Sequence, residues 1–361
     1  MAGAVTSSTI VRGTDVAIIG DGVIGLSTAL ELANAGATCC IIGNHRDGAA
    51  SSAAAGLLAP TVGHIPSGAQ PFFMASLGRY SAFVEALREF EPGLSILYGL
   101  IEVSSPASGH SHAASSERLT SEDLSRLEPS LSAPWGGLFH AHDGAIDNVR
   151  LMLALRRAVS GQPRVRIIAD NPAVAVGVTA DLASVDLSDG TRAEAAHVVI
   201  AAGAWSPALR GLPRPLPVTP LKGQMLALGG GNAIRHAVMG GDVYLVPREH
   251  ETVIGATSEL AGFDTTTNPR AIEGLRAAAV SLCPALATAP TRRAWAGIRP
   301  ATPDMLPIIG RDPDAPRLLY ACGHSKNGIL LAPATARAVT ALARETQPES
   351  DLSAFSISRF S

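Results

Sequence analysis

The chain has 361 residues, of which 47% are hydrophobic and 16% are charged, and its formal net charge at pH 7 is −3. This composition is typical of a globular protein, and at roughly 150 residues per domain the length favours about two domains. The slight negative balance indicates no general nucleic-acid surface, and no apolar run reaches the ~18 residues of a membrane-spanning helix.

Both ends of the chain are predicted to lie outside the folded domains. Residues 1–11 lack the apolar segment of a signal peptide and are interpreted as a flexible leader, and residues 346–361 as a polar, peripheral tail. Four cysteines without CxxC spacing indicate reduced core thiols, so we expect a cytoplasmic protein.

The first fifty residues predict a strand, a glycine-rich turn, a helix and a second strand. Asp15–Ile19 is apolar, Gly20–Gly25 reads GDGVIG, and Leu26–Ala35 carries helix formers. In a GxGxxG turn the first glycine permits the tight turn, the second lets backbone approach a pyrophosphate, and the third lets helix and strand pack closely. The pattern therefore indicates a dinucleotide site, FAD or NAD, with a bare glycine turn as the alternative.

The second strand, Thr38–Ile42, ends without the acidic residue that normally binds the ribose hydroxyls of the dinucleotide. Gly43 stands at that place and Asn44 follows it. Neither side chain carries a carboxylate, so Asn44, His45 or water would have to make weaker contacts. We therefore expect weaker dinucleotide binding, and the sequence leaves open what replaces the acid.

Further along the chain, turn residues and hydrophobic patterns predict more strands and helices. Ser51–Leu57 consists of small residues that would let a flat ligand lie against the backbone, with a flexible loop as the alternative. The other predicted elements are a helix over Arg79–Phe90, an exposed loop over Ser104–Ser116, a hairpin turning at Asp189 and Gly190, a strand from His197 that ends in a turn at Gly203, strands over Gly241–Pro247 and Thr252–Ala256, and a helix over Arg270–Val280.

Two pairs of histidines, His110/His112 and His140/His142, raise the question of a metal site. The sequence has no HExxH motif, and neither pair comes with cysteines or carboxylates at zinc spacing. We therefore predict no metal site, and we interpret His142–Gly144 as a turn.

Two basic residues near the end of the chain stand out. Arg299 lies among glycine, proline and small residues, and a solvated loop arginine is the plain alternative to a ligand role. Its position before a second apolar strand and a glycine turn favours the ligand role. Lys326, within GHSKNGILLAP, is one of only two lysines in the chain.

These residues belong to a pattern that covers nearly the whole chain. Its most telling stretches are AIIGDGVIGLSTALEL, SSAAAGLLAP, VVIAAGAWSPAL, PVTPLKGQ, VYLVPRE with VIGAT, WAGIRPATPDMLPIIG and GHSKNGILLAPAT. On these stretches the chain resembles the D-amino-acid oxidase (DAO) family of FAD-dependent oxidoreductases, and within it the glycine oxidases most closely, over residues 14 to 345.

The resemblance implies an α/β fold with a Rossmann-type FAD-binding domain and an α+β substrate domain that has a mixed or antiparallel sheet. The FAD-binding domain would be discontinuous, comprising 12–60, 140–205 and 295–345. The substrate-binding domain would comprise 61–139 and 206–294. The FAD would be bound non-covalently, and the protein would be a homo-oligomer.

The resemblance also implies roles for individual residues. Arg299 and Tyr244 would bind the substrate and, with Lys326, act in catalysis, while Ser325 and Leu57 would line the substrate site. The residues implied to contact the cofactor are Gly20, Gly22, Val23, Ile24, Gly25, Gly43, Asn44, Ser51, Ser52, Ala55, Gly56, Leu57, Ala173, Gly203, Arg299, His324, Ser325, Lys326, Asn327, Gly328, Ile329 and Leu330.

The implied reaction is oxidation of the Cα–N bond of glycine or an N-substituted glycine by hydride transfer to the flavin. The imine would hydrolyse to glyoxylate and ammonia or an amine, and O2 would be reduced to H2O2. An amino-acid dehydrogenase that passes electrons to a quinone or another acceptor is the alternative.

The chain departs from the family at the last motif, where glycine oxidases typically carry HFRNG and this sequence has HSKNG. Ser325 removes an aromatic ring, and Lys326 replaces a planar fork by a point charge on a flexible stem. A pocket reshaped for an N-substituted glycine and a tolerated change with glycine retained as substrate are both open.

Overall fold

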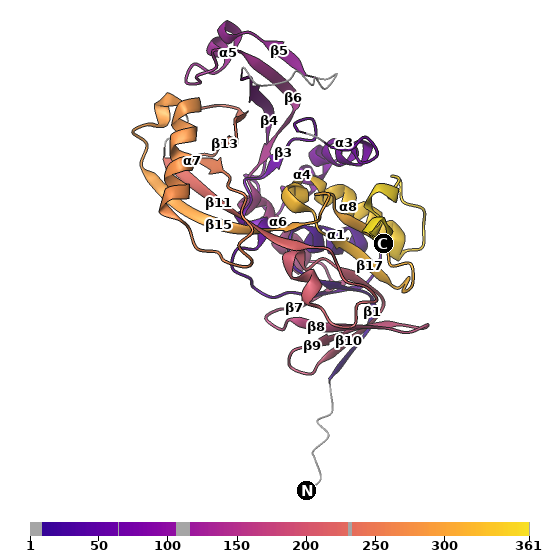
Figure 1. The fold of residues 1–361 in the computed structure, drawn as a ribbon. Helices are drawn as coiled ribbons and strands as arrows, with labels where there is room; N and C mark the ends of the chain where they lie inside the picture. The colour runs from indigo at the N-terminus through magenta and orange to yellow at the C-terminus, as the bar shows by residue number, and fades with distance from the viewer. Residues whose placement is uncertain (1–8, 64, 106–115, 230–232, 361) are drawn as a thin grey trace. The chain divides into compact units, whose positions relative to one another are not determined.

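The computed structural model describes residues 9–63, 65–105, 116–229 and 233–360, and the chain divides into two compact units (Figure 1). The first unit comprises residues up to Arg46, Leu153–Thr219 and those from Pro300 onward. The second unit comprises Asp47–Met152 and Pro220–Arg299.

These units differ in detail from the predicted domains. Residues 47–60, 140–152 and 295–299 belong to the second unit, although we predicted them in the FAD-binding domain. Residues 206–219 belong to the first unit, although we predicted them in the substrate domain. Which segments bind the cofactor is a separate question, and that part of the prediction stays a prediction.

The first unit is built on an eight-stranded sheet with the order β16-β17-β10-β1-β2-β7, to which β9 and then β8 add beside β10. The strands are β1 (Ile10–Ile19), β2 (Cys39–Ile42), β7 (Val165–Ile168), β8 (Ala173–Val178), β9 (Ala183–Leu187), β10 (Arg192–Ile200), β16 (Ile308–Arg311) and β17 (Leu318–Cys322). β1 pairs in parallel with both β2 and β10, so their carboxyl ends meet at one edge of the sheet. Ligands of open parallel sheets bind at such an edge.

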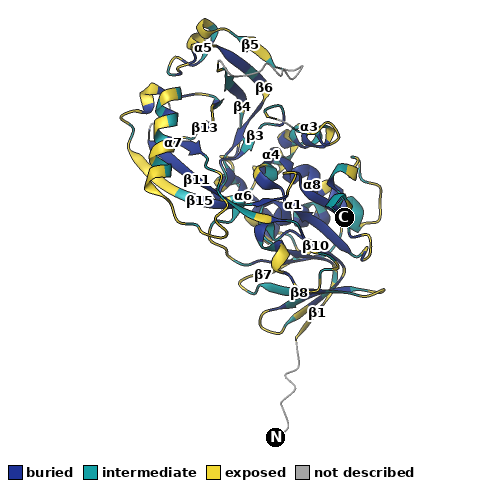
Figure 2. Cartoon of the chain, viewed as in Figure 1, coloured by how far each residue is buried: buried dark blue, intermediate teal, exposed yellow. Residues whose placement is uncertain are grey.

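Helices α1 (Val23–Asn34) and α8 (Gly328–Ala343) pack on each other, and α8 also contacts β16 and β17. The apolar runs of β1 and β10 do not alternate with polar residues, as expected for strands that are buried on both faces (Figure 2). The hairpin predicted at Gly190 is confirmed, because β9 pairs antiparallel with β10.

The second unit is built on a nine-stranded, mostly antiparallel sheet with the order β15-β11-β14-β13-β12-β4-β6-β3, to which β5 adds beside β6. Its strands are β3 (Leu57–Leu58), β4 (Ile96–Val103), β5 (Glu117–Leu119), β6 (Gly137–Ile146), β11 (Thr219–Gly229), β12 (Ala237–Gly240), β13 (Val243–Pro247), β14 (Glu251–Gly255) and β15 (Thr291–Ala301). Leu275 and Ala279 of α7 (Pro269–Leu282) pack against this sheet in one apolar cluster with Leu226 and Ile254.

The remaining helices are short or connect these elements. They are α2 (Ala50–Ala53), α3 (Gln70–Gly78), α4 (Tyr80–Leu87), α5 (Ser121–Leu127), α6 (Asn148–Ser160) and the 3-10 turns η1 (Gly203–Ala208), η2 (Pro284–Leu286), η3 (Ser325–Asn327), η4 (Ser353–Phe355) and η5 (Ile357–Phe360). None of the helices in the described ranges is long and apolar enough to cross a membrane.

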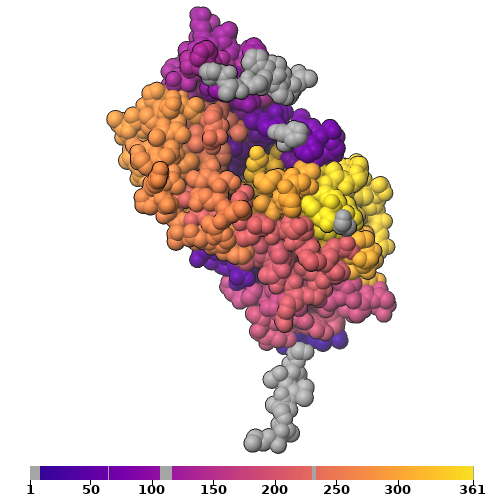
Figure 3. Space-filling view, viewed as in Figure 1, coloured from indigo at the N-terminus to yellow at the C-terminus, as the bar shows by residue number. Residues whose placement is uncertain are grey.

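Three predictions about local structure are wrong. β1 begins at Ile10, inside the predicted leader, and the tail is not wholly peripheral, because Phe355 and Ile357 are buried. Figure 3 shows other C-terminal residues, in yellow, at the surface. His142–Gly144 lies within β6 rather than in a turn. Gly144 serves close packing there, because a Cβ atom on it would lie 1.9 Å from the carbonyl oxygen of Leu97.

A buried ion pair joins the second and third sequence segments of the first unit. Asp312, which is fully buried, accepts hydrogen bonds from Arg214 Nε (2.9 Å) and the Tyr320 hydroxyl (2.9 Å). Burial raises the pKa of Asp312, but hydrogen bonds from the backbone N–H of Asp314, from Tyr320 and from Arg214 outweigh it and lower the pKa overall.

We expect Asp312→Ala to destabilise the first unit by about 3 kcal/mol, because it leaves a buried hydroxyl and a guanidinium without their partner. Since the folded pKa of Asp312 is below its unfolded value of ~3.9, its contribution is present above that value and is lost as the pH falls through the folded pKa. Urea midpoints at several pH values measure both effects. Asp314→Ala is the matched control, because its exposed carboxylate binds the same arginine and should contribute under ~1 kcal/mol. Equal effects of the two variants would contradict the prediction.

Candidate functional site

The glycine-rich turn between β1 and α1 has the shape that a dinucleotide requires. Gly20 has φ +117°, and a Cβ atom on it would lie 2.3 Å from the carbonyl oxygen of Ala201. A Cβ atom on Gly25 would lie 1.9 Å from the carbonyl oxygen of Gly20. The first and third glycines of the motif are therefore required by packing, as the sequence predicted.

The second glycine leaves the start of α1 without a side-chain cap. Gly22 is the N-cap residue, and the first-turn residues Val23, Ile24 and Gly25 are buried. A phosphate suits such a helix start, because its negative charge is favourable at the positive end of the helix dipole and it accepts hydrogen bonds from backbone N–H groups. These residues therefore fit the pyrophosphate of a dinucleotide.

Other predicted cofactor residues of the first unit lie at strand and helix ends. Gly43 follows β2, Ala173 begins β8, and Gly203 begins η1 with φ +57°. The segment from His324 to Leu330 forms η3 and the first turn of α8, where Asn327 is the N-cap and makes no side-chain cap bond.

The motif HSKNG places three side chains in different surroundings. His324 is buried, its Nε2 lies 3.1 Å from Thr335 Oγ1, and burial lowers its pKa to about 3. Ser325 is also buried, has φ +50°, and its hydroxyl donates to the sulfur of Met305 (3.6 Å). Lys326 is exposed.

In the second unit, Arg299 lies on β15 and not on a loop. Its Nη1 donates to the carbonyl oxygen of Thr257 (3.0 Å). A Cβ atom on Gly223 would lie 2.4 Å from Nη2 and 2.5 Å from Cζ of Arg299. The guanidinium therefore occupies the space that a side chain at position 223 would fill, and only glycine permits this arrangement.

Tyr244, on β13, is placed beside the guanidinium by a second glycine. A Cβ atom on Gly255 would lie 2.3 Å from the Tyr244 hydroxyl oxygen, which itself donates to the sulfur of Met225 (3.8 Å). Burial raises the pKa of Tyr244, and the charge and hydrogen bond of Arg299 oppose that rise. The structure thus brings Tyr244 and Arg299 together, and Tyr244 is a neutral phenol.

The backbone that holds Arg299 is itself fixed by residues that the sequence analysis missed. The Thr257 hydroxyl accepts from the Gln224 N–H (2.8 Å) and donates to Glu259 (2.5 Å). Gln224, which is fully buried, also donates to Glu259 from its amide (2.8 Å). In the sequence these residues show only as a short polar run, Thr257–Glu259, after an apolar strand. Such a run predicts a turn as readily as a group of residues that holds the backbone beside Arg299.

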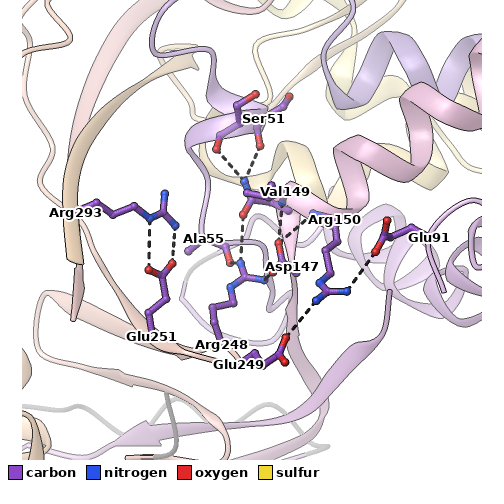
Figure 4. Close-up of polar contacts among 12 residues, drawn as sticks. Ser51, Ala55, Glu91, Asp147, Val149, Arg150, Arg248, Glu249, Glu251 and Arg293 are labelled. Carbon is purple, nitrogen blue, oxygen red and sulfur yellow. Dashed lines mark hydrogen bonds and ion pairs between the residues drawn. The ribbon is translucent and has the colours of Figure 1, made fainter. Parts of the chain in front are cut away.

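The small-residue segment around Ser51 and Ala55 is held in place by polar side chains (Figure 4). Asn148 Nδ2 donates to the carbonyl oxygens of Ser51 (2.9 Å) and Ser52 (3.1 Å). Arg248 Nη2 donates to the carbonyl oxygen of Ala55 (2.7 Å). The segment is thus fixed rather than a flexible loop.

Its last residues pack just as closely. Gly56 has φ +81°, and a Cβ atom on it would lie 1.9 Å from the carbonyl oxygen of Ile146. Leu57, which begins β3, is partly exposed.

The histidine pairs can be judged only in part, because His110 and His112 lie outside the described residues. The His140 ring is buried and has protein partners, Thr61 Oγ1 at 2.7 Å and Glu102 at 3.3 Å. Among the residues that the structure describes, no group of three or more histidine, cysteine, aspartate or glutamate side chains could hold a metal.

Comparison with known proteins decides the family. The model of the FAD dependent oxidoreductase family matches residues 15–342. The chain belongs to this family. The predicted family, enzyme class and cofactor are therefore confirmed: the chain is an FAD-dependent oxidoreductase, and the alternative of an NAD site is removed.

Individual relatives agree with this assignment. The chain is 35% identical to the bifunctional protein ThiO/ThiG of Synechocystis sp. over 96% of its own length, but it spans only 54% of that protein. It is 32% identical to the glycine oxidase of Pseudomonas putida, over 92% of this chain and 95% of that one. The chain thus spans about half the length of the bifunctional ThiO/ThiG protein, whereas the glycine oxidase is of similar length.

Solved structures confirm the predicted fold class. Glycine oxidase from Geobacillus kaustophilus superimposes with a TM-score of 0.87 at 29% identity, covering 96% of this chain and 98% of that one. Iminodiacetate oxidase from Chelativorans sp. superimposes with a TM-score of 0.81 at 26% identity, covering 94% and 98%.

We expect the His324 imidazole to stay neutral between about pH 8 and pH 5, because burial lowers its pKa to about 3. The unfolded chain takes up this proton near pH ~6.5, so the group reduces stability progressively as the pH falls from that value toward the folded pKa. NMR spectra of histidine-labelled protein, assigned with His324→Asn, should show one imidazole that does not titrate in that range. An inflection of this signal between pH 5 and 8 would contradict the prediction.

Proposed function

We propose that this protein oxidises the Cα–N bond of glycine or an N-substituted glycine with O2 as the electron acceptor. For glycine the balanced reaction consumes O2 and H2O and forms glyoxylate, NH3 and H2O2. The names of a glycine oxidase and an iminodiacetate oxidase among its similar structures support this substrate class.

The observation that carries the proposal is the unpaired charge of Arg299. Two partly buried arginines have carboxylate partners, Arg214 in Asp312 and Arg248 in Asp147, whereas Arg276 and Arg311 bind carbonyl oxygens. Arg299 differs from the latter pair because the Tyr244 phenol lies beside it. Arg299 has a carbonyl oxygen but no carboxylate among its partners in the described ranges. A guanidinium binds a carboxylate with two parallel hydrogen bonds, and a substrate carboxylate would compensate this charge.

The same charge suits the chemistry of an amine. Oxidation requires the neutral amine, and a positive charge close by disfavours the ammonium form. The neutral Tyr244 phenol adds a hydrogen-bond donor beside Arg299 without adding a charge. FAD supplies the electron sink when it is bound, and the residues of this chain supply the position of the substrate.

The last motif supports an N-substituted glycine within this class. Ser325 and Lys326 stand where glycine oxidases typically carry phenylalanine and arginine, so the segment presents a smaller buried side chain and an exposed flexible cation. A smaller side chain admits a larger substituent on the substrate nitrogen, provided that these residues lie at the substrate site.

A cytoplasmic location and a homo-oligomeric state are further parts of the proposal. The four cysteines are free and buried, as expected for reduced core thiols. Gel filtration with light scattering measures the oligomeric state directly.

We expect Arg299→Ala to lower kcat/KM by roughly 30- to 5,000-fold, because truncating one partner of a desolvated charge pair costs about 2–5 kcal/mol. Gly223→Ala should also raise KM, because its methyl group displaces the guanidinium. Oxygen uptake with each variant measures the loss. Arg293→Ala is the matched control, since Arg293 lies on the same strand but pairs with Glu251. Unchanged turnover by Arg299→Ala would rule out this carboxylate site.

We expect sarcosine and N-ethylglycine to be turned over with a higher kcat/KM than glycine. The double variant Ser325→Phe with Lys326→Arg, which restores the usual motif, should shift the ratio back toward glycine. Parallel measurement of O2 consumption and H2O2 release tests substrate and acceptor together. Fast turnover of glycine alone would contradict the larger pocket, and turnover only with an added quinone would show a dehydrogenase instead.

A further inference from the structure

The place of the missing ribose-binding acid is filled by a side chain from elsewhere in the sequence. A Cβ atom on Gly43 would lie 2.9 Å from Cγ, 3.0 Å from Cβ and 3.1 Å from Oδ2 of Asp21. The distance to Cγ is shorter than real Cβ contacts, and the other two are tighter than most, so Asp21 would have to shift; they involve the root of the Asp21 side chain as well as its tip. Asp21 therefore occupies the space in which an acidic side chain at position 43 would begin.

The pairing of the strands explains why these two residues meet. β1 and β2 are parallel neighbours with Ile19 opposite Ile42, so each strand ends at the same edge of the sheet. The N–H of Gly20 donates to the carbonyl oxygen of Ile42 (2.9 Å), which fixes the glycine-rich turn against the end of β2. Asp21 and Gly43 follow directly after these residues.

The Asp21 carboxylate is oriented with one oxygen still available. Arg156, on α6, donates to Oδ2 at 3.0 Å, and the Asp21 side chain is 26% exposed. Within the described residues Oδ1 has no hydrogen-bond partner. The Asp21 carboxylate is therefore suited to bind hydroxyl groups, because Arg156 holds one of its oxygens and the other oxygen can accept hydrogen bonds.

The residue next to Gly43 is a weaker candidate for this role. In the orientation that satisfies both groups, the amide oxygen of Asn44 accepts from Arg46 Nε at 3.1 Å. Its acceptor is thus already engaged by a neighbour, whereas Asp21 Oδ1 is not.

We propose that Asp21 binds the hydroxyls of the adenosine ribose of FAD, in place of an acid at position 43, and that Arg156 orients its carboxylate. The carboxylate has moved from the end of the second strand to the second position of the GDGVIG turn. The weaker dinucleotide binding that the sequence predicted is then not expected.

The first test is the affinity of the apoprotein for FAD, measured by quenching of FAD fluorescence. Asp21→Ala should raise Kd ~10- to 100-fold, because it removes charge-assisted hydrogen bonds. FAD with a 2′-deoxyribose in the adenosine half should bind wild type more weakly but bind Asp21→Ala no more weakly than FAD itself. Asp170→Asn is the matched control, because Asp170 is an exposed acid just beyond the neighbouring strand β7 and should leave Kd unchanged.

The second test exchanges the two positions. Gly43→Glu alone should weaken FAD binding, because its Cβ atom collides with Asp21. In the Asp21→Gly background the same substitution should instead strengthen binding, and the double variant should recover most of the wild-type affinity. If the effect of Gly43→Glu on the FAD affinity changes sign between the two backgrounds, this double-mutant cycle shows that positions 21 and 43 are directly coupled.

The outcomes separate binding from folding. Melting temperatures of the apoproteins identify variants that are merely unfolded, and in that case the milder Asp21→Asn, with an expected rise in Kd of ~10-fold, decides the question. A Kd within twofold of wild type for folded Asp21→Ala or Asp21→Asn, or a double variant no better than Gly43→Glu alone, would overturn the proposal. Neither test depends on the substrate, so the proposed reaction can fail while this assignment stands.

Discussion

The candidate site depends on the absence of a Cβ atom at a few positions. At Gly20 and Gly25 the missing atom lets two backbone segments approach each other, and this creates an uncapped helix start at the edge of a parallel sheet. At Gly223 and Gly255 it leaves room for the charged and polar ends of Arg299 and Tyr244. An alanine at Gly20 or Gly25 would force the backbone apart, and an alanine at Gly223 or Gly255 would displace the Arg299 guanidinium or the Tyr244 phenol.

The partners of Arg299 differ from those of two structural arginines that lie in ion pairs. Arg214 and Arg248 are neutralised by carboxylates of the same unit, and their removal would affect stability or the path of the backbone. Arg299 binds the Thr257 carbonyl oxygen and lies beside Tyr244, and the Thr257 segment is itself held by Gln224 and Glu259. Keeping a cation in place without neutralising it is costly for folding, and it is useful if an anionic ligand completes the pair.

The sequence was sufficient where the determining contacts are local. The strand, glycine-rich turn and helix at Gly20–Gly25 follow from neighbouring residues, and the structure reproduces them. It was insufficient where contacts are non-local. The Asp143-Gly144 pair is typical of a turn, yet Gly144 lies in a strand because the carbonyl oxygen of Leu97 approaches it closely. The tail seemed polar, but two of its apolar residues, Phe355 and Ile357, are buried.

The same distinction applies to the two departures from the family pattern. Gly43 looked like a loss because nothing nearby in the sequence carries a carboxylate. The structure shows the Asp21 side chain beside Gly43, and in our proposal Asp21 compensates the missing acid. No neighbouring side chain takes the place of the missing ring at Ser325: within the described residues, the Ser325 hydroxyl donates only to the Met305 sulfur. A compensated pair conserves the chemistry of a site, whereas an uncompensated reduction in side-chain size alters its shape. We therefore relate Asp21 and Gly43, as proposed, to retention of the cofactor, and the proposal of an N-substituted substrate relates Ser325 and Lys326 to the shape of the substrate site.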